Sequence, residues 1–137
     1  MEHQTLCTYN EGMQFDIAIN QHHFTIDANI ENGGANVGPS PKPLLLASLA
    51  GCTAMDVVSL LKKMHVNFSD FKVETIAPLT DEHPKVYEYI QLNYHILIDE
   101  TDKPKMEKAV ALSIDKYCGV YAMLSKALMI KHTIIYH

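Results

Sequence analysis

The amino-acid sequence predicts an α+β fold in which one long apolar helix separates two groups of strands. Three observations lead to this prediction. Apolar and polar residues alternate on both sides of an almost uninterrupted apolar stretch at residues 44–61, and a length of 137 residues suits one compact domain. The expected order is βββ-α-ββ-αα-β, within a single domain that covers residues 1–137.

The first group of strands is expected before residue 30. A strand near residues 6–9 is followed by a hairpin turn at Glu11 and Gly12, and residues 13–19 alternate as in a half-buried strand. A third short strand is expected at residues 24–28. The next segment, residues 32–41, is rich in Gly, Asn and Pro, and we expect it to be flexible or to contact a ligand.

The central helix is predicted at residues 41–65, with Ser40 as its cap and Pro41 at its first position. It is apolar around most of its circumference, and such a helix is normally buried on nearly every side. A chain of 137 residues has difficulty in surrounding it. We therefore expect a second copy to cover this helix in an obligate homodimer.

The second half of the chain repeats the alternation. Strands are expected at residues 71–77 and 86–98, and a helix begins at Thr101 or Asp102 and tolerates Pro104 in its first turn. Gly119 is expected to break this helix, before a short helix and a last strand at residues 130–136. The residues expected on the buried faces are Val86, Ile90, Leu92, Tyr94, Ile96 and Ile98 in the strand and Met106, Val110, Ser113, Ile114 and Tyr117 in the helix.

The composition excludes several functional classes. The net charge is −5, and all 11 basic residues are Lys, so the clustered basic side chains of a nucleic-acid-binding protein are missing. Asp56 lies inside the apolar stretch, where a carboxylate disfavours a membrane span. No secretion signal is expected, and an odd number of cysteines favours reduced thiols in the cytoplasm. The histidines lack metal-ligand spacing and no nucleotide loop is present, so neither a metal nor a bound cofactor is expected.

One polar stripe runs along the central helix. On a helical wheel its five members span about 80°, and they are Ser48, Cys52, Asp56, Ser59 and Lys63. A thiol beside polar groups is more reactive than one in hydrocarbon, but cysteine is also a common small buried residue, and both interpretations of Cys52 remain open. Asp56 could hinder the thiol by its charge or make a structural hydrogen bond, and the second role is the simpler one.

The other two cysteines are interpreted from their places in the predicted elements. Cys118 continues the buried face of its helix and directly precedes Gly119, where the chain can move, as a resolving thiol requires. Sequence alone does not show that Cys118 and Cys52 meet. Cys7, on the first predicted strand, is interpreted as structural.

Three segments together resemble the OsmC/Ohr family (osmotically inducible protein C-like). They are residues 38–58 (GPSPKPLLLASLAGCTAMDVV), 82–87 (EHPKVY) and 116–120 (KYCGV), and the resemblance extends over roughly residues 12–137. The stretches CTAMDVV and HPKVY are similar to the YhfA-type branch of this family.

The resemblance implies an OsmC-like fold, in which the long central helix packs against sheets in an intertwined homodimer. It also implies a thiol-dependent reductase of organic hydroperoxides that serves the oxidative stress response. Cys52 matches the position that attacks the peroxide, and Cys118 matches the position that resolves the product to a disulfide. The implied reductant is an external lipoyl-type dithiol, which a lipoylated partner protein could carry.

The sequence departs from the family at two supporting positions. Established members hold the thiolate with an Arg that a Glu positions, whereas this chain has no Arg and carries Lys42 at the Glu position. Lys42, Asp56 and Ser48 are the candidate supporting residues. The alternative to the enzyme is a non-catalytic dimeric module that binds a small apolar or thiol ligand at the subunit interface; a hydrolase built on Ser48 and a distant His is a remote third.

Overall fold

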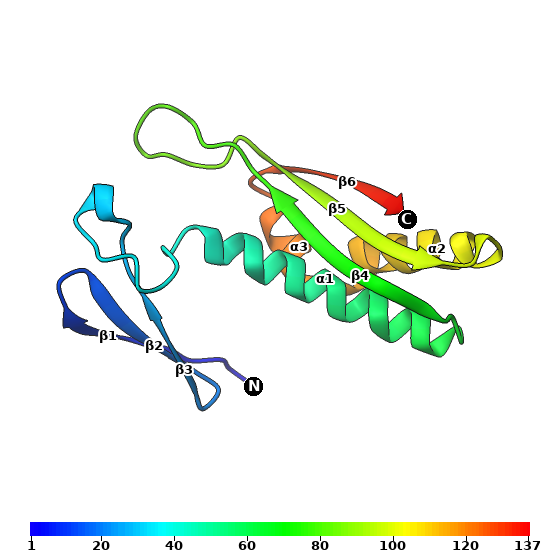
Figure 1. Cartoon of the computed structure of the whole chain (residues 1–137), viewed down its shortest axis with the longest axis horizontal. Helices are drawn as coiled ribbons and strands as arrows, with labels where there is room; N and C mark the ends of the chain where they lie inside the picture. Colours follow the sequence, from blue (N-terminus) through cyan, green and yellow to red (C-terminus); the bar gives the residue numbers. More distant parts are fainter. The chain divides into compact units, whose positions relative to one another are not determined.

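The structure is a computed structural model that describes residues 1–137, and the chain forms two compact units, Met1–Leu46 and Ala47–His137. Its elements follow the order β1-β2-β3-α1-β4-β5-α2-α3-β6, with two three-stranded sheets (Figure 1). This confirms the predicted α+β class and the predicted order of elements.

The N-terminal unit contains one antiparallel sheet in the order β1-β2-β3. Its strands are Thr5–Glu11, Gln14–Ile19 and His22–Ile26. Gly12 has a φ of 56° in the first turn, and Asn20 and Gln21 in the second have φ values of 47° and 69°. Two successive positive φ values give the backbone twist that a two-residue hairpin needs, so β3 begins two residues earlier than predicted.

The Gly/Asn-rich segment after β3 folds around the buried carboxylate of Asp27. This carboxylate accepts hydrogen bonds from the backbone N–H groups of Ala28, Ala35 and Val37, at 2.7, 3.1 and 3.2 Å. Burial alone would raise the pKa of Asp27, but these N–H donors outweigh it and hold the pKa below its usual value. A side chain at Gly38 would collide with the carbonyl of Thr25, which explains why the smallest residue stands there.

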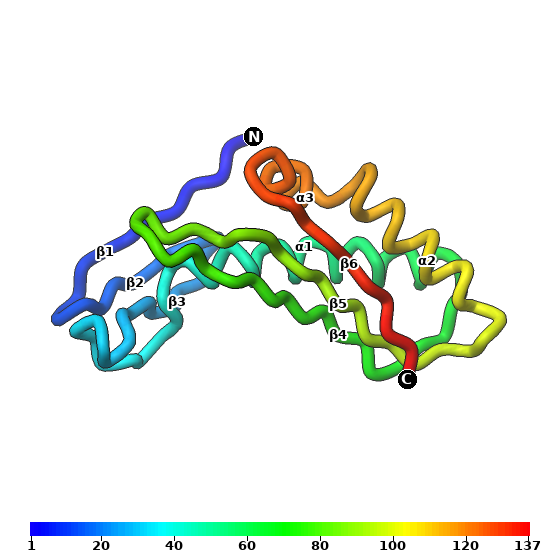
Figure 2. The backbone as a smooth tube through the Cα atoms, turned by 90° about the horizontal axis from the view of Figure 1, so that it is seen from above, coloured from blue at the N-terminus to red at the C-terminus, as the bar shows by residue number.

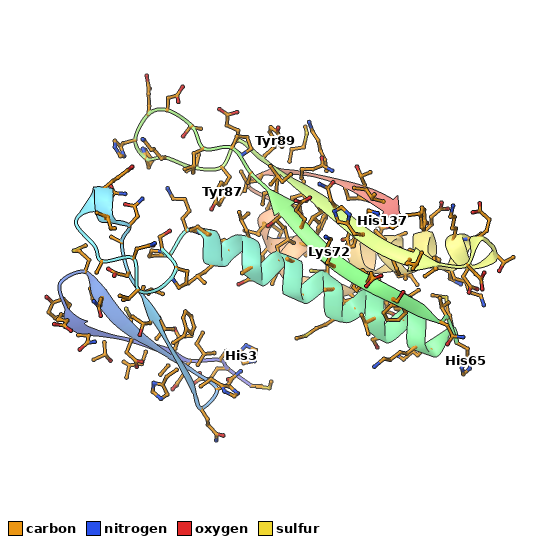
Figure 3. The ribbon with its side chains drawn as sticks, viewed as in Figure 1. His3, His65, Lys72, Tyr87, Tyr89 and His137 are labelled. Carbon is orange, nitrogen blue, oxygen red and sulfur yellow. The ribbon has the colours of Figure 1, made fainter.

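Helix α1 covers Pro43–Lys63, two residues shorter at each end than predicted. At its N-terminal end, Leu44 and Leu45 donate to the carbonyls of Pro41 and Lys42 in a turn that precedes the helix. At its C-terminal end, His65 takes a left-handed φ of 56° (Figure 3), and Val66 N–H donates to Leu61 C=O at 2.9 Å. This is the hydrogen-bonding pattern with which many helices terminate.

The C-terminal unit contains the second sheet, in the order β4-β5-β6. Its strands are Phe68–Ile76, Tyr89–Ile98 and Met129–Tyr136; β4 and β5 are antiparallel, while β5 and β6 are parallel. The helices lie on one side of this sheet (Figures 1 and 2). The strand residues that form the core beneath them are Ile90, Leu92, Tyr94 and Ile96.

Two details of this sheet differ from the prediction. A bulge between Ser69 and Lys72, with Asp70 at a φ of 51°, lets β4 begin three residues earlier. Tyr87 pairs with Leu79 in an isolated bridge and is buried, whereas Val86 is half exposed. The alternation therefore breaks before β5, and the prediction that Val86 lies on the buried face is wrong.

The helical segment after β5 has three parts. Helix α2, Lys103–Leu112, includes Pro104 in its first turn as predicted, and Asp102 precedes it without a side-chain cap hydrogen bond. A π-helical turn, Ser113–Tyr117, follows, and α3, Gly119–Leu124, completes the segment. The break falls at Cys118, whose ψ of 99° is extended, and Gly119 instead begins α3. Tyr117 is 50% exposed, so the prediction that it lies on the buried face is wrong, because the wide π-helical turn changes the side-chain period before it.

Helix α1 is only partly covered within one chain. Its buried residues repeat every fourth position, at Leu49, Thr53, Val57 and Leu61. By length and apolar composition it could cross a membrane, a test that core helices of soluble proteins also pass, and 22% of its most apolar window is buried. Apart from the polar stripe and the lysines at its C-terminal end, the remaining surface of this helix carries apolar side chains such as Leu45 and Met55, which are exposed in the single chain.

Candidate functional site

Two cysteines and one carboxylate meet at the middle of α1 in the C-terminal unit. The Sγ atoms of Cys52 and Cys118 and a carboxylate oxygen of Asp56 all lie within 4.8 Å of one another. Both thiols are free. Cys52 and Asp56 stand one helical turn apart on α1, as their spacing predicts, while Cys118 comes from the opposite segment between the π-helical turn and α3.

The π-helical turn determines where Cys118 points. The backbone N–H of Cys118 donates to Ser113 C=O at 2.8 Å, which closes the wide turn. The extended ψ of Cys118 then ends the helix. The Sγ atom accepts a hydrogen bond from Tyr121 N–H at 3.3 Å at the start of α3. Backbone hydrogen bonds thus hold the Cys118 main chain on one side and its sulfur on the other.

A chain of hydroxyl groups leads from the core to Asp56. Thr53 Oγ1 lies 2.7 Å from Tyr94 Oη and 2.8 Å from Ser113 Oγ. Ser113 Oγ in turn donates to Asp56 Oδ2 at 3.0 Å. The three hydroxyl residues are fully buried, so each hydroxyl needs a hydrogen-bond partner. The hydrogen bonds between them and to Asp56 supply a partner for each one.

The site keeps its most deeply buried acidic groups protonated. Burial, followed by the hydrogen bond and charge of Cys52 and by the Asp56 charge, raises the pKa of Cys118 to about 11, although the Tyr121 N–H opposes this. Burial also raises the pKa of Tyr94 to about 12, although its hydrogen bond with Thr53 lowers the pKa. Cys118 is therefore a thiol and Tyr94 a neutral phenol at neutral pH.

Solvent reaches the site from the side of Asp56. A small groove of about 130 Å³ is lined by Asp56, Ser59, Leu60, Lys63 and Tyr117. Cys52 and Asp56 are half-buried, whereas Cys118 is 3% exposed. A small molecule that enters here meets Asp56 first, and Cys52 is the more accessible of the two thiols.

No cationic side chain of the chain contacts these three groups directly. Among all 137 residues, no Lys or His nitrogen forms an ion pair with Asp56, and no Lys nitrogen hydrogen-bonds either sulfur. The family's Arg is absent from the sequence. Lys63 lines the groove but makes no ion pair with Asp56.

The structure unites some of the predicted site residues and not others. It brings Cys52, Asp56 and Cys118 together, and Asp56 makes the structural hydrogen bond that was the simpler of its two predicted roles. Ser48 lies on α1, one turn before Cys52, and is exposed. Lys42 is exposed just before α1 in the N-terminal unit, and Cys7 is exposed on β1.

The sequence interpretation did not include the hydroxyl chain, although its signal was present. Thr53 lies on the otherwise apolar stripe of α1, Tyr94 lies on the apolar face of β5, and Ser113 lies on the buried face of the second helical segment. Polar groups on faces that the pattern assigns to a core must find one another, because a buried hydroxyl without a partner is costly.

Comparison with known proteins is consistent with this fold. The family model described as OsmC-like protein matches residues 33–133. Protein YhfA of Escherichia coli K12 is 32% identical over 124 residues, which cover 90% of each chain.

Solved structures are similar over nearly the whole chain. An OsmC-like protein from Mycoplasma pneumoniae superposes with a TM-score of 0.83 at 15% identity, over 99% of this chain and 97% of that one. An organic hydroperoxide resistance protein from Elizabethkingia anophelis superposes with a TM-score of 0.70 at 14% identity, over 100% and 99%. These two structures show the same fold. The family model over residues 33–133 and the 32% identity to Protein YhfA show that the chain belongs to the OsmC-like family.

Proposed function

We propose that this protein reduces organic hydroperoxides with the thiol pair Cys52 and Cys118. The observation that carries the proposal is the approach of the two sulfurs to within 4.8 Å, between segments that are remote in the sequence. Membership of a family that includes proteins named for organic hydroperoxide resistance supports it.

In the first step, Cys52 attacks the O–O bond of the hydroperoxide as a thiolate. The sulfur forms a bond to one oxygen, the alkoxide leaves and takes a proton, and the products are a sulfenic acid on Cys52 and an alcohol. The sulfur is oxidised by two electrons and the peroxide is reduced by two. Cys52 suits this step because it is the half-buried thiol of the pair.

In the second step, Cys118 attacks the sulfur of the sulfenic acid. A Cys52–Cys118 disulfide forms and the hydroxyl leaves as water, with the proton that Cys118 gives up. The raised pKa of Cys118, about 11, suits a thiol that waits for the first step rather than one that begins the reaction. The Asp56 carboxylate, which lies within 4.8 Å of both sulfurs, is positioned to carry that proton.

The cycle closes with an external dithiol, which reduces the disulfide by thiol–disulfide exchange and is itself oxidised to a disulfide. We propose a small lipoyl-type dithiol for this role and a cytoplasmic location, where such reductants keep protein thiols reduced. No bound cofactor takes part in these steps.

The test is peroxide oxidation of the fully reduced protein, followed by peptide mapping. With cumene hydroperoxide we expect one alcohol per chain and a Cys52–Cys118 disulfide. Cys118→Ser should stop at a sulfenic acid on Cys52 that dimedone traps, and Cys7→Ser should behave as the wild type. The absence of the Cys52–Cys118 cross-link under excess peroxide would refute the mechanism.

The lack of a cation at the sulfurs favours a second candidate function, a non-catalytic module that binds a small apolar or thiol ligand. Established family members stabilise the thiolate with an Arg that a Glu positions, and this chain has no Arg to stabilise a thiolate at Cys52 in that way. Binding of such a ligand that persists in Cys52→Ser, together with no peroxide consumption by the wild type, would favour the module over the enzyme.

A further inference from the structure

The thiol pair and Asp56 also have the composition and the spacing of a metal site. Two sulfurs and one carboxylate oxygen lie within 4.8 Å of one another in the reduced chain. A tetrahedral Zn²⁺ ion places sulfur and oxygen ligands about 3.5–3.8 Å apart. Small rotations of the side chains would close the remaining difference.

The negative charge that this cluster can carry favours a bound cation. If both thiols ionise, the three groups carry three negative charges, and no Lys or His nitrogen pairs with Asp56. The described hydrogen bond of Asp56 goes to one carboxylate oxygen, Oδ2, and comes from Ser113. Thiolate and carboxylate ligands together favour a borderline-soft divalent cation over Mg²⁺ or Ca²⁺.

The surrounding groups orient the ligand atoms in the way metal sites require. Ser113 Oγ donates to Asp56 Oδ2 at 3.0 Å and is itself held by Thr53, while Tyr121 N–H donates to the sulfur of Cys118 at 3.3 Å. Such outer contacts fix ligand geometry. The groove beside Asp56, with a volume of about 130 Å³, opens on the carboxylate side of the cluster.

We propose that the reduced protein binds one Zn²⁺ ion through Cys52, Cys118 and Asp56, with an open fourth position. Binding releases the two thiol protons to solvent and involves no change of oxidation state. The same two sulfurs at the roughly 2 Å separation of a disulfide cannot hold the ion. Zn²⁺ binding and peroxide oxidation are therefore mutually exclusive states of the site, and the ion shields the thiols from oxidation.

The experiment titrates Co²⁺ into the full-length protein after reduction and removal of metals. We expect a thiolate-to-Co²⁺ charge-transfer band that saturates at one ion per chain and is displaced by Zn²⁺. Cys52→Ser and Cys118→Ser should abolish or strongly reduce this band. Asp56→Asn is nearly isosteric but removes a charged ligand. It should weaken Zn²⁺ affinity by at least about 10- to 100-fold, the usual effect of losing a residue that only hydrogen-bonds to a metal ligand. Cys7→Ser, outside the cluster, is the matched control and should retain the full band.

A second arm separates this proposal from the proposed function. Metal-free and Zn²⁺-loaded protein are each exposed to cumene hydroperoxide, and the Cys52–Cys118 disulfide is quantified; we expect it in the metal-free sample and strong suppression in the loaded one. If the metal-free protein forms the disulfide but the Co²⁺ titration gives no charge-transfer band, the metal site is refuted and the reductase stands. A band that survives both Cys→Ser substitutions, or one lost in Cys7→Ser, would also overturn the metal site.

Discussion

Cys52 and Cys118 are chemically identical side chains that their surroundings make different. Cys118 is 3% exposed, accepts a hydrogen bond from Tyr121 N–H and faces the other thiol and a carboxylate. Burial and these neighbours raise its pKa to about 11. Cys52, half-buried on α1, is the thiol that a solvent-borne reagent reaches first. This division of roles depends on the segment at Cys118 and not on the residue types.

Alkylation of the reduced protein tests this division. A raised pKa means that the thiolate of Cys118 appears only as the pH approaches about 11, so iodoacetamide should modify Cys52 well before Cys118 at neutral pH. In Cys52→Ala, two of the causes that raise the pKa of Cys118 are removed while burial, the largest, remains. The midpoint of its pH–rate profile should therefore fall but stay above the ordinary thiol value.

The alkylation rates are measured by peptide mass spectrometry as a function of pH. Cys7→Ser serves as the control because Cys7 is exposed and would otherwise consume reagent. Equal rates for Cys52 and Cys118 at neutral pH would contradict the assignment of attacking and resolving thiols.

At the scale of elements, the hydroxyl chain joins α1, β5 and the π-helical turn. Its three hydrogen bonds span sequence separations of 41, 60 and 57 residues. Thr53 is the middle member, since its hydroxyl meets both Tyr94 and Ser113. The position of Asp56 beside the two sulfurs therefore depends on how three separate elements pack.

Replacement of Thr53 by Val should show this dependence. Val has nearly the same shape but leaves the buried hydroxyl of Tyr94 without its partner, which costs about 1–3 kcal/mol of unfolding free energy. In the Tyr94→Phe background that hydroxyl is gone, and the same substitution should cost less. Urea denaturation of the two single variants, the double variant and the wild type, at one protein concentration, measures the coupling, which we expect to reach about 1 kcal/mol. Strict additivity would show that the two hydroxyls do not interact.

The secondary-structure elements could be predicted from the sequence, whereas the tertiary contacts between them could not. Alternation and apolar periodicity are local signals, so the order of all strands and helices was correct. The errors fall where the backbone departs from regular geometry: the bulge at Asp70, the bridge at Tyr87, and the break at Cys118 instead of Gly119. The approach of Cys118 to Cys52 depends on the π-helical turn, for which the local sequence carries no pattern.

At the scale of the whole molecule, α1 exposes large apolar side chains to water in the single chain. Met55 is 77% exposed on this helix, and a shallow apolar groove beside it is lined by Ala54, Val58 and Phe71 among others. Apolar side chains on strands of the N-terminal unit are also exposed, including Leu6 and Tyr9. Large apolar side chains that lie exposed on a soluble protein often mark an interface, so we expect a second copy to cover those of α1.

The homodimer is tested by placing a charge on the exposed face of α1. We expect the wild type to sediment as a dimer at micromolar concentration, and Met55→Glu to sediment as a monomer or to unfold at a lower urea concentration. The reason is that an interface cannot bury an unpaired carboxylate without a large desolvation cost. Ala111→Glu is the matched control, because Ala111 is exposed on α2 beside Glu107 and Lys108, where a further charge remains in water. The control should remain dimeric. A wild type that stays monomeric and soluble over the micromolar range would refute the homodimer and would require the apolar surface of α1 to be stable in water.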